Sequence, residues 1–197
     1  IDQFAFSDQV RFCYVGALSE DVWHQPKTLI ELYRRLRTLF PKTQLTIVTT
    51  SEHESLRHNF AQFPENEIII TATKNRSELK QILENQDFGL MTYRKPKYDK
   101  EILLGRTVIG VKSAEYFVAG LPMICNAYCG GVGRLIEKNQ LGITYFPESL
   151  DKLSAHQISD YLNKIAKQRC QDFAIEAFSY GASAQRYNNL YKNIFSQ

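Results

Sequence analysis

The stretch VKSAEYFVAGLPMIC, from Val111 to Cys125, contains the pattern that decides the fold of this 197-residue chain. Its first part, Lys112–Ala119, predicts a short helix. Gly120 then stands where the end of a helix favours a residue that tolerates the left-handed backbone conformation. The last part, Leu121–Cys125, is a short apolar run entered through a proline, which is typical of a buried strand. The stretch therefore predicts a helix that leads directly into a buried strand.

A glycine-rich helix start lies shortly after this strand. The run Cys129-Gly130-Gly131-Val132-Gly133 precedes a second predicted helix at Val132–Lys138. The start of a helix presents free N–H groups and the positive end of the helix dipole, and both attract an anion. Gly130 and Gly131 fit a plain flexible turn, but they also allow backbone amides to approach a diphosphate closely. We favour the anion site.

Strand-like and helix-like segments alternate along the rest of the chain. Hydrophobic periodicity predicts further strands at Val10–Val15, Leu45–Thr49, Ile68–Thr71, Phe88–Thr92 and Gly142–Phe146. Helices are predicted at Pro26–Leu39, from Ser51 with Glu54 in a capping box, at Glu78–Leu83 capped by Asn75 or Ser77, and at Ser154–Ala166, Gln168–Phe178 and Ser179–Phe195. We expect little structure in residues 1–8 and a loop at Tyr93–Gly110.

This alternation, without two-residue hairpin turns, predicts an α/β fold. We expect a Rossmann-like, doubly wound, mostly parallel sheet of about six strands, with helices on both faces and further helices at the C-terminus. Residues 1–197 are expected to form a single domain. Sheets of this kind bind ligands beyond the carboxyl ends of their strands.

The composition is that of an ordinary globular protein, with 44% hydrophobic and 23% charged residues. A net charge of +3 is compatible with an anionic ligand or an acidic membrane surface, but it is too small to indicate a nucleic-acid partner. No apolar run approaches membrane-spanning length, and no signal peptide is visible. We expect a cytoplasmic protein, with the inner face of the membrane as the alternative location.

Cysteine and carboxylate spacing gives no metal site. The four cysteines, Cys13, Cys125, Cys129 and Cys170, are expected to be buried or spectator thiols of a reducing compartment, because no His or Cys cluster has zinc spacing. No Asp-x-Asp motif is present, and Asp99 with Glu101 in a basic loop is only a weak exception.

The residues after the first predicted strand, Gly16 to Ser19, occupy the place of a phosphate-binding loop. They match neither the dinucleotide fingerprint nor a P-loop, which argues against a nicotinamide or flavin enzyme and against an NTPase. Glu115 is either an exposed acid paired with Lys112 one turn back or a carboxylate that accepts hydrogen bonds from two ribose hydroxyls. Its place beside the glycine run favours the second interpretation.

The run KSAEYFVAGLPMI, followed by a Gly-Gly pair and a helix, resembles the donor-binding half of GT-B glycosyltransferases. It is most similar to the large retaining group, glycosyl transferases group 1, which includes many bacterial polysaccharide and lipopolysaccharide enzymes. The likeness covers most of the chain. Phe12–Gly16 and Lys27–Leu36 resemble the opening strand and helix of that half, and Phe178–Tyr180 with Arg186, Tyr187 and Tyr191 resembles its aromatic-rich C-terminal helices.

The resemblance implies a ligand and roles for particular residues. Glu115 holds the ribose hydroxyls, Gly130 to Val132 offer amides to the diphosphate, and Thr71–Lys74 meets the base. A UDP- or GDP-sugar is then the donor substrate. The resemblance implies no cofactor and no bound metal, because helix dipoles and basic side chains stabilise the leaving diphosphate. The acceptor, a glycan or a lipid-linked acceptor, is bound by an N-terminal domain that we expect to be absent from this chain.

The chain departs from the family pattern where phosphate and sugar are bound. Thr107 stands where the family usually has a sugar-contacting Glu, and Lys112 takes over part of that role. Ala17 replaces the family's phosphate-binding Arg, and His24 or Lys27 stands near its phosphate-binding Lys. Arg94, Lys95 and Lys97 supply substitute charge. The predicted donor site comprises Gly16, Ser19, Lys27, Thr73, Lys74, Arg94, Thr107, Lys112, Glu115, Gly130, Gly131 and Val132.

Two other functions fit the same pattern. A non-catalytic descendant of the fold, serving as a binding or assembly domain, is favoured by Thr107 and Ala17. An unrelated doubly wound enzyme that modifies nucleotide sugars, such as an epimerase, shares the glycine run after Cys129. The catalytic residues themselves are not evident from the sequence.

Overall fold

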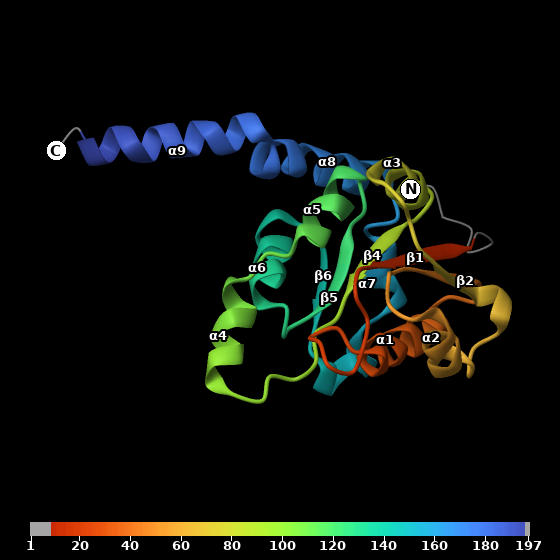
Figure 1. Ribbon diagram of the computed structural model, residues 1–197. Helices are drawn as coiled ribbons and strands as arrows, with labels where there is room; N and C mark the ends of the chain where they lie inside the picture. Colours follow the sequence, from red (N-terminus) through yellow and green to blue (C-terminus); the bar gives the residue numbers. More distant parts are fainter. Residues whose placement is uncertain (1–8, 196–197) are drawn as a thin grey trace.

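A six-stranded parallel sheet forms the centre of the molecule (Figure 1). The computed structural model describes residues 9–195 and contains β1 (Val10–Val15), β2 (Thr43–Val48), β3 (Ile68–Thr71), β4 (Phe88–Met91), β5 (Met123–Asn126) and β6 (Gly142–Tyr145). The strand order is β3-β2-β1-β4-β5-β6, and every neighbouring pair is parallel. The predicted fold is confirmed; residues 1–8, expected to have little structure, lie outside the described residues.

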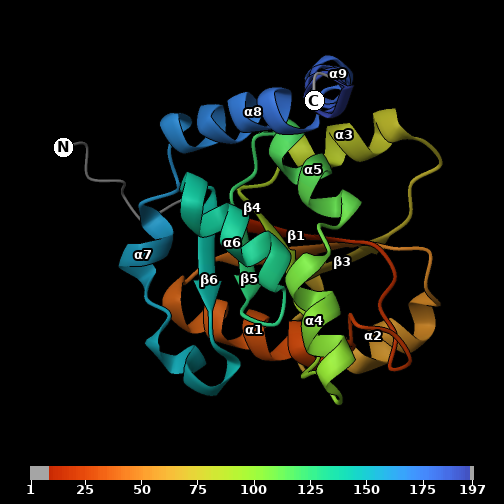
Figure 2. The same cartoon turned by 90° about the vertical axis from the view of Figure 1, so that its left-hand side faces the viewer.

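Helices cover both faces of the sheet (Figure 2). On one face lie α1 (Pro26–Leu39), α2 (His53–Phe60) and α7 (Ala155–Ser159), and on the other lie α3 (Arg76–Glu84), α5 (Val111–Val118), α6 (Gly130–Asn139) and α8 (Lys164–Phe178). The side chains of β1 alternate between the two layers, with Phe12 and Tyr14 facing α1 and Cys13 facing α5. Because both of its faces are buried, β1 is apolar almost throughout, as parallel strands usually are.

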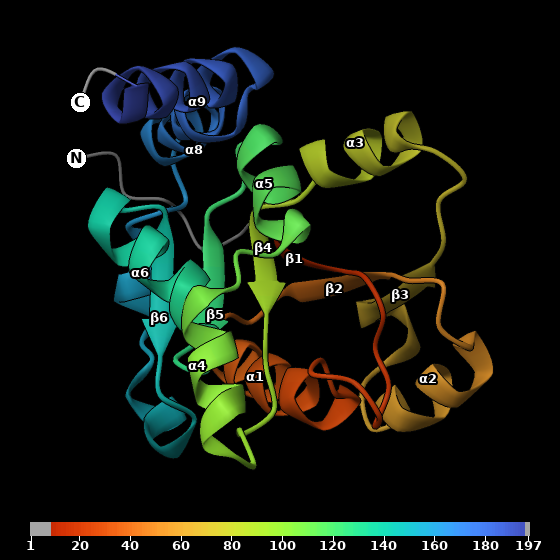
Figure 3. The ribbon, with the colours of Figure 1, turned by 60° about the vertical axis from the view of Figure 1, so that its left-hand side comes forward.

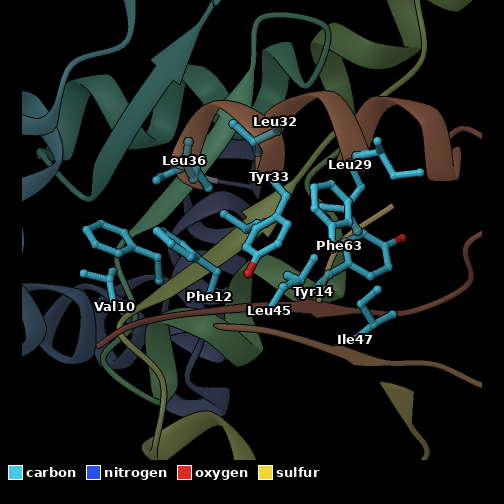
Figure 4. Close-up of a cluster of buried hydrophobic side chains, with 14 of the residues drawn as sticks. Val10, Phe12, Tyr14, Leu29, Leu32, Tyr33, Leu36, Leu45, Ile47 and Phe63 are labelled. Atoms are coloured by element: carbon cyan, nitrogen blue, oxygen red, sulfur yellow. The ribbon is translucent and has the colours of Figure 1, made fainter. Parts of the chain in front are cut away.

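The larger core cluster lies between α1 and the strands β1 and β2 (Figure 4). Leu29, Leu32, Tyr33 and Leu36 share one stripe of α1 and are fully buried. This spacing is that of an amphipathic helix packed on a core, and it explains why the predicted bounds of α1 match the observed ones.

β1 and β4 separate at their carboxyl ends. β1 pairs with β2 along its whole length, but it pairs with β4 only at Phe12 and Cys13. The hydroxyl of Tyr116 fills the gap: it accepts the Val15 N–H at 2.8 Å and lies 3.2 Å from the Leu90 carbonyl oxygen. Gly89 makes room for the ring, since a Cβ there would lie 2.5 Å from Tyr116 Cγ. We call this opening between β1 and β4, closed at its base by Tyr116, the fork.

The helix–strand unit predicted at Val111–Cys125 is present. α5 ends at Val118, and Gly120 follows with φ +76°, the left-handed conformation that glycine adopts at little cost. The strand begins at Met123, two residues later than predicted, because Pro122 contributes a carbonyl to the Gly89 N–H but has no N–H of its own for the ladder.

The expected loop at Tyr93–Gly110 contains a helix, α4 (Asp99–Thr107), so that prediction was wrong. α4 buries only Gly105, and its apolar side chains Ile102, Leu103 and Leu104 are exposed. A helix without a buried apolar stripe lacks the periodicity by which sequence analysis recognises helices. Asp99 and Glu101 in its first turn favour the helix dipole.

Helix starts account for several further differences, and β2 begins two residues before the predicted Leu45. Glu52, not Ser51, caps α2 by accepting the Glu54 and Ser55 amides, and these bonds lower the pKa of its carboxyl. Asn75 caps α3, which starts two residues before the predicted Glu78. The helix predicted at Ser154–Ala166 is broken, because Ser154 caps the short α7 and Asn163 caps a new helix, α8. Short 3₁₀ turns occur at Glu65–Glu67 and Pro147–Lys152.

The last helix, α9 (Tyr180–Phe195), extends away from the body of the molecule (Figure 1). It buries no residue, and its exposed side chains include Tyr187, Leu190 and Ile194. All four cysteines, by contrast, are free and buried, with Cys13, Cys125, Cys129 and Cys170 lying in the layer beneath α5, α6 and α8.

We predict that Tyr116→Phe destabilises the fold. The substitution leaves the buried Val15 N–H without a partner, which costs about 1–3 kcal/mol of unfolding free energy. Urea denaturation followed by circular dichroism measures this loss. Tyr187→Phe on the exposed α9 is the matched control and is expected to stay within about 0.5 kcal/mol of wild type. Equal midpoints for the Tyr116 variant and wild type would show that the hydroxyl does not stabilise the fork.

Candidate functional site

The carboxyl ends of the strands form the edge at which open α/β sheets bind ligands. The fork lies in the middle of this edge, where the strand order reverses between β1 and β4. α1 and α6 start there, since they follow the carboxyl ends of β1 and β5, and α5, which follows β4 by way of α4, begins with Lys112 against Gly16. The structure brings Gly16 and Lys112 together at the fork and distributes the other predicted residues around it.

Lys112 lies across the backbone of Gly16. Its Nζ donates to the Tyr14 hydroxyl at 3.3 Å and lies 5.1 Å from the centre of the Tyr14 ring. A Cβ on Gly16, whose φ is +120°, would lie 2.5 Å from this Nζ and closer still to Cε. Burial lowers the pKa of Lys112 to about 8, against the opposing effects of Cys129 and Glu115. Among residues 9–195, no carboxylate forms an ion pair with it.

The start of α5 offers free backbone donors beside this ammonium group. Gly110 precedes the helix without a side-chain cap, and its carbonyl accepts from both N and Oγ of Ser113. Within the described part of the chain, the Val111 and Lys112 amides have no hydrogen-bond partner. A cation and two free amides therefore lie at one helix start, which is an arrangement suited to a phosphate.

His24 closes the fork on the side of the β1–α1 connection. Its Nδ1 lies 3.0 Å from the Thr92 carbonyl oxygen, and its ring packs edge-on against Tyr14 and Tyr93. Burial, together with the charge of Lys112, lowers the pKa of His24 to about 3. The imidazole is therefore neutral near pH 7, and it cannot act as the second phosphate-binding cation.

Glu115 lies one turn after Lys112 on α5 and is partly exposed. Its carboxylate makes no hydrogen bond or ion pair with residues 9–195, but its charge raises the pKa of Lys112. A carboxylate with unused acceptors beside a cation is consistent with the predicted ribose contact. That role stays a prediction.

Gly130, Gly131 and Val132 form the first turn of α6, which starts two residues before the predicted Val132, and their amides have no partner among the described residues. The connection between α4 and α5 covers this turn (Figure 3). A Cβ on Gly131 would clash with the Val108 carbonyl, and one on Gly130 would lie 3.4 Å from Arg106 Cα. The glycines are therefore required for packing in this structure, and their contact with a diphosphate stays a prediction.

Arg94 is engaged by another residue. Its guanidinium forms two hydrogen bonds with Glu101, at 2.8 and 3.1 Å, and stacks on Trp23. The pairing with Arg94, helped by the Lys97 amide, lowers the pKa of Glu101 to about 2. The weakly suspected metal ligand Glu101 is thus the counter-ion of Arg94, and Lys95 and Lys97 are the exposed cations of this segment.

Three further predicted residues make contacts of their own, none of them with Lys112. The Thr107 hydroxyl bonds back to the Leu103 and Leu104 carbonyls of its own helix. Ser19 closes a turn, since its amide donates to the His24 carbonyl. Lys27, exposed in the first turn of α1, lines a separate hollow of about 480 Å³ together with Arg94, Lys95 and Lys97.

Thr73 and Lys74 follow β3, the edge strand, and lie two strands away from β1. Thr73 is half-buried, whereas Lys74 is exposed and its amide donates to Glu78 at 2.8 Å.

A smaller hollow, of about 170 Å³, lies beside the fork and is lined mostly by apolar groups, among them Trp23, Leu104 and Val108.

Sequence analysis missed Tyr14 and the free amides at the start of α5. A tyrosine within an apolar strand must bring its hydroxyl to a partner when it is buried, and this signal was present in VRFCYV. The absence of a capping side chain before Val111 was also readable, since glycine precedes it. The meeting of Tyr14 with Lys112, 98 residues apart, was not readable.

Residues 9–195 contain neither a metal-ligating cluster nor a membrane-spanning helix. No three His, Cys, Asp or Glu side chains gather in a way that would hold a metal ion. No helix there combines the length and apolar character needed to cross a bilayer.

The sequence matches one family model. Residues 2–177 match glycosyl transferases group 1, which is most of the chain. No curated protein matches it.

Solved glycosyltransferase structures share the fold at low sequence identity. WaaG, a glycosyltransferase involved in lipopolysaccharide biosynthesis, is 15% identical over 89% of this chain with a TM-score of 0.63. HepE of Anabaena, solved with UDP, is 17% identical over 96% with a TM-score of 0.66. TarM of S. aureus, solved with UDP, is 16% identical over 90% with a TM-score of 0.59. The chain spans only 46%, 50% and 35% of these three structures.

The family match covers both the helix–strand unit at Val111–Cys125 and the fork that it closes. The TM-scores of 0.63 and 0.66 with WaaG and HepE show that the fold is shared. The chain therefore belongs to the glycosyl transferases group 1 family and has the Rossmann-like fold of a GT-B glycosyltransferase half.

Proposed function

We propose that this chain is the nucleotide-sugar-binding domain of a glycosyltransferase that transfers a hexose-type sugar from a UDP- or GDP-sugar. The observation that carries the proposal is the half-buried ammonium group of Lys112 at the fork, beside two free amides of α5. A cation without a counter-ion at the start of a helix is suited to bind an anion. We propose that this anion is the diphosphate of the donor.

The rest of the donor follows from this anchor. With the diphosphate on Lys112 and the α5 amides, Glu115 one turn further along the helix accepts the ribose hydroxyls. The Thr71–Lys74 segment, including Thr73 and Lys74, meets the base at the end of β3. The transferred sugar then lies toward the α4–α5 connection, near Thr107 and the small apolar hollow.

The relatives support a nucleotide ligand. HepE was solved with UDP-glucose as well as with UDP, and TarM was solved with UDP. WaaG acts in lipopolysaccharide biosynthesis. By this likeness, we propose a polysaccharide, lipopolysaccharide or related acceptor, a glycan or lipid-linked molecule, held by a second domain. Alone, the domain then binds donor but transfers nothing.

The proposed reaction uses no metal. Lys112 and the starts of α5 and α6 stabilise the negative charge that develops on the leaving diphosphate. We further propose a cytoplasmic location, with peripheral attachment of the full-length enzyme to the inner face of the membrane as the alternative.

A second candidate function is binding without transfer. Thr107 stands where the family usually has a sugar-contacting carboxylate. Its hydroxyl carries no charge, and it donates to carbonyls of its own helix. A full-length protein that binds a UDP- or GDP-sugar and does not transfer the sugar would identify this function.

We predict that Glu115→Ala weakens UDP or GDP binding about 10- to 100-fold. Loss of charge-assisted hydrogen bonds to the ribose removes about 1.5–3 kcal/mol of binding free energy. Isothermal titration calorimetry with each nucleotide measures the change. Glu176→Ala, an exposed acid on α8, is the matched control and should bind like wild type. Unchanged affinity of the Glu115 variant would refute the ribose role.

We also predict that chelation of divalent metal leaves nucleotide affinity unchanged within about twofold, because Lys112 and helix amides supply the positive charge. The same titration in EDTA and in excess Mg²⁺ or Mn²⁺ measures this. A tenfold gain with either metal would contradict the metal-independent mechanism.

A further inference from the structure

The ammonium group of Lys112 is held where its charge is poorly stabilised. Side chains from β1, the β1–α1 connection and α6 surround it. The groups that face it are the Tyr14 hydroxyl and ring from β1, the His24 imidazole from the connection, the Cys129 thiol before α6 and, on its own helix, Glu115.

Of these neighbours, only Glu115 carries a negative charge near pH 7. Burial raises the pKa of both Tyr14 and Cys129, so the phenol and the thiol stay protonated. Burial lowers the pKa of His24 to about 3, so the imidazole stays neutral. Glu115 lies one turn away and forms no ion pair with Lys112 among residues 9–195. Burial therefore outweighs attraction and lowers the pKa of Lys112 to about 8.

The geometry points to a proton-linked donor site: binding of the diphosphate is coupled to uptake of a proton by Lys112, and Tyr14 is the positioning residue that sets this coupling. The inference rests on the proposed function. A diphosphate at the fork adds negative charge next to the amine and favours its charged form. The proton comes from solvent and stays on Nζ until the ligand leaves.

Tyr14 has this role because its hydroxyl links two elements. It accepts from Lys112 Nζ and donates to the Ala17 carbonyl at 2.6 Å, so it fixes the amine over Gly16 and beside the connection that follows β1. It also supplies an acceptor that favours the charged amine. Tyr14→Phe keeps the ring but removes that acceptor.

Isothermal titration of the whole chain with UDP-glucose, and in parallel with GDP-mannose, tests the coupling. Titrations at one pH in two buffers of different ionisation enthalpy give the number of protons taken up per ligand. From a free-protein pKa of about 8, the uptake should rise from about 0.1 proton at pH 7 to about 0.5–0.75 at pH 8.5, depending on how far the ligand raises the pKa. The Lys112→Arg variant should take up no proton on binding. Its titration therefore also corrects for ionisation of the nucleotide base. Lys138→Arg, exposed at the end of α6, should behave like wild type.

A second measurement does not depend on the Arg variant. The ¹³Cε shift of Lys112 against pH should show a midpoint near 8 in the free protein and a midpoint at least one unit higher with ligand bound. Tyr14→Phe should move the free midpoint down by about half a unit or more. A purely structural role of Tyr14 would leave that midpoint unchanged, and this result would overturn the positioning role.

The outcomes separate the two proposals. Binding of either nucleotide sugar with no proton uptake at pH 8.5 overturns the coupling and leaves the proposed function standing. Binding of neither ligand overturns both. If the Tyr14 variant does not fold, the wild-type proton count and midpoint still decide whether the coupling exists.

Discussion

The hydrogen bond between the Val15 amide and the Tyr116 hydroxyl is the contact on which this structure depends. β1 and β4 would otherwise leave unpaired backbone groups where they separate, because their ladder ends at Cys13 and Gly89. Buried unpaired amides are costly, so strands part only where another donor or acceptor takes over. Tyr116 belongs to α5, and its hydroxyl therefore ties the helix that starts at the candidate site to the sheet. Lys112, on the same helix, is positioned over Gly16 at the fork by this link.

A second constraint acts at the start of α6. The backbone of Val108 approaches Gly131 so closely that no side chain fits between them, and Arg134 donates a hydrogen bond to the Arg106 carbonyl. α4, which buries little of its own surface, is linked to α6 by these contacts (Figure 3). The helix dipole at the start of α6 thus faces the carbonyl end of α4. A diphosphate that used the α6 amides would compete with that end, whereas the α5 amides beside Lys112 face no such competitor.

Local patterns predicted the architecture and only part of the site. The stripe of α1 and the left-handed Gly120 could be read from a few neighbouring residues, and both were confirmed. α4 was missed because Ile102, Leu103 and Leu104 have no core to face. The contact that positions the cation of the site joins distant segments, since Tyr14 meets Lys112 across 98 residues. A single sequence gives no register between such segments. It also does not show that burial makes His24 neutral.

The buried thiols have a practical consequence. Cys13 lies on β1 and Cys125 on β5, both in the core layer that α5, α6 and α8 cover, and neither is accessible while these helices stay on the sheet. Burial also raises the pKa of Cys13 to about 12, so little of the reactive thiolate form exists in the native state. Alkylating reagents can therefore label these positions only in molecules whose helical layer has lifted. The rate at which these thiols are alkylated therefore reports how often this helical layer opens locally.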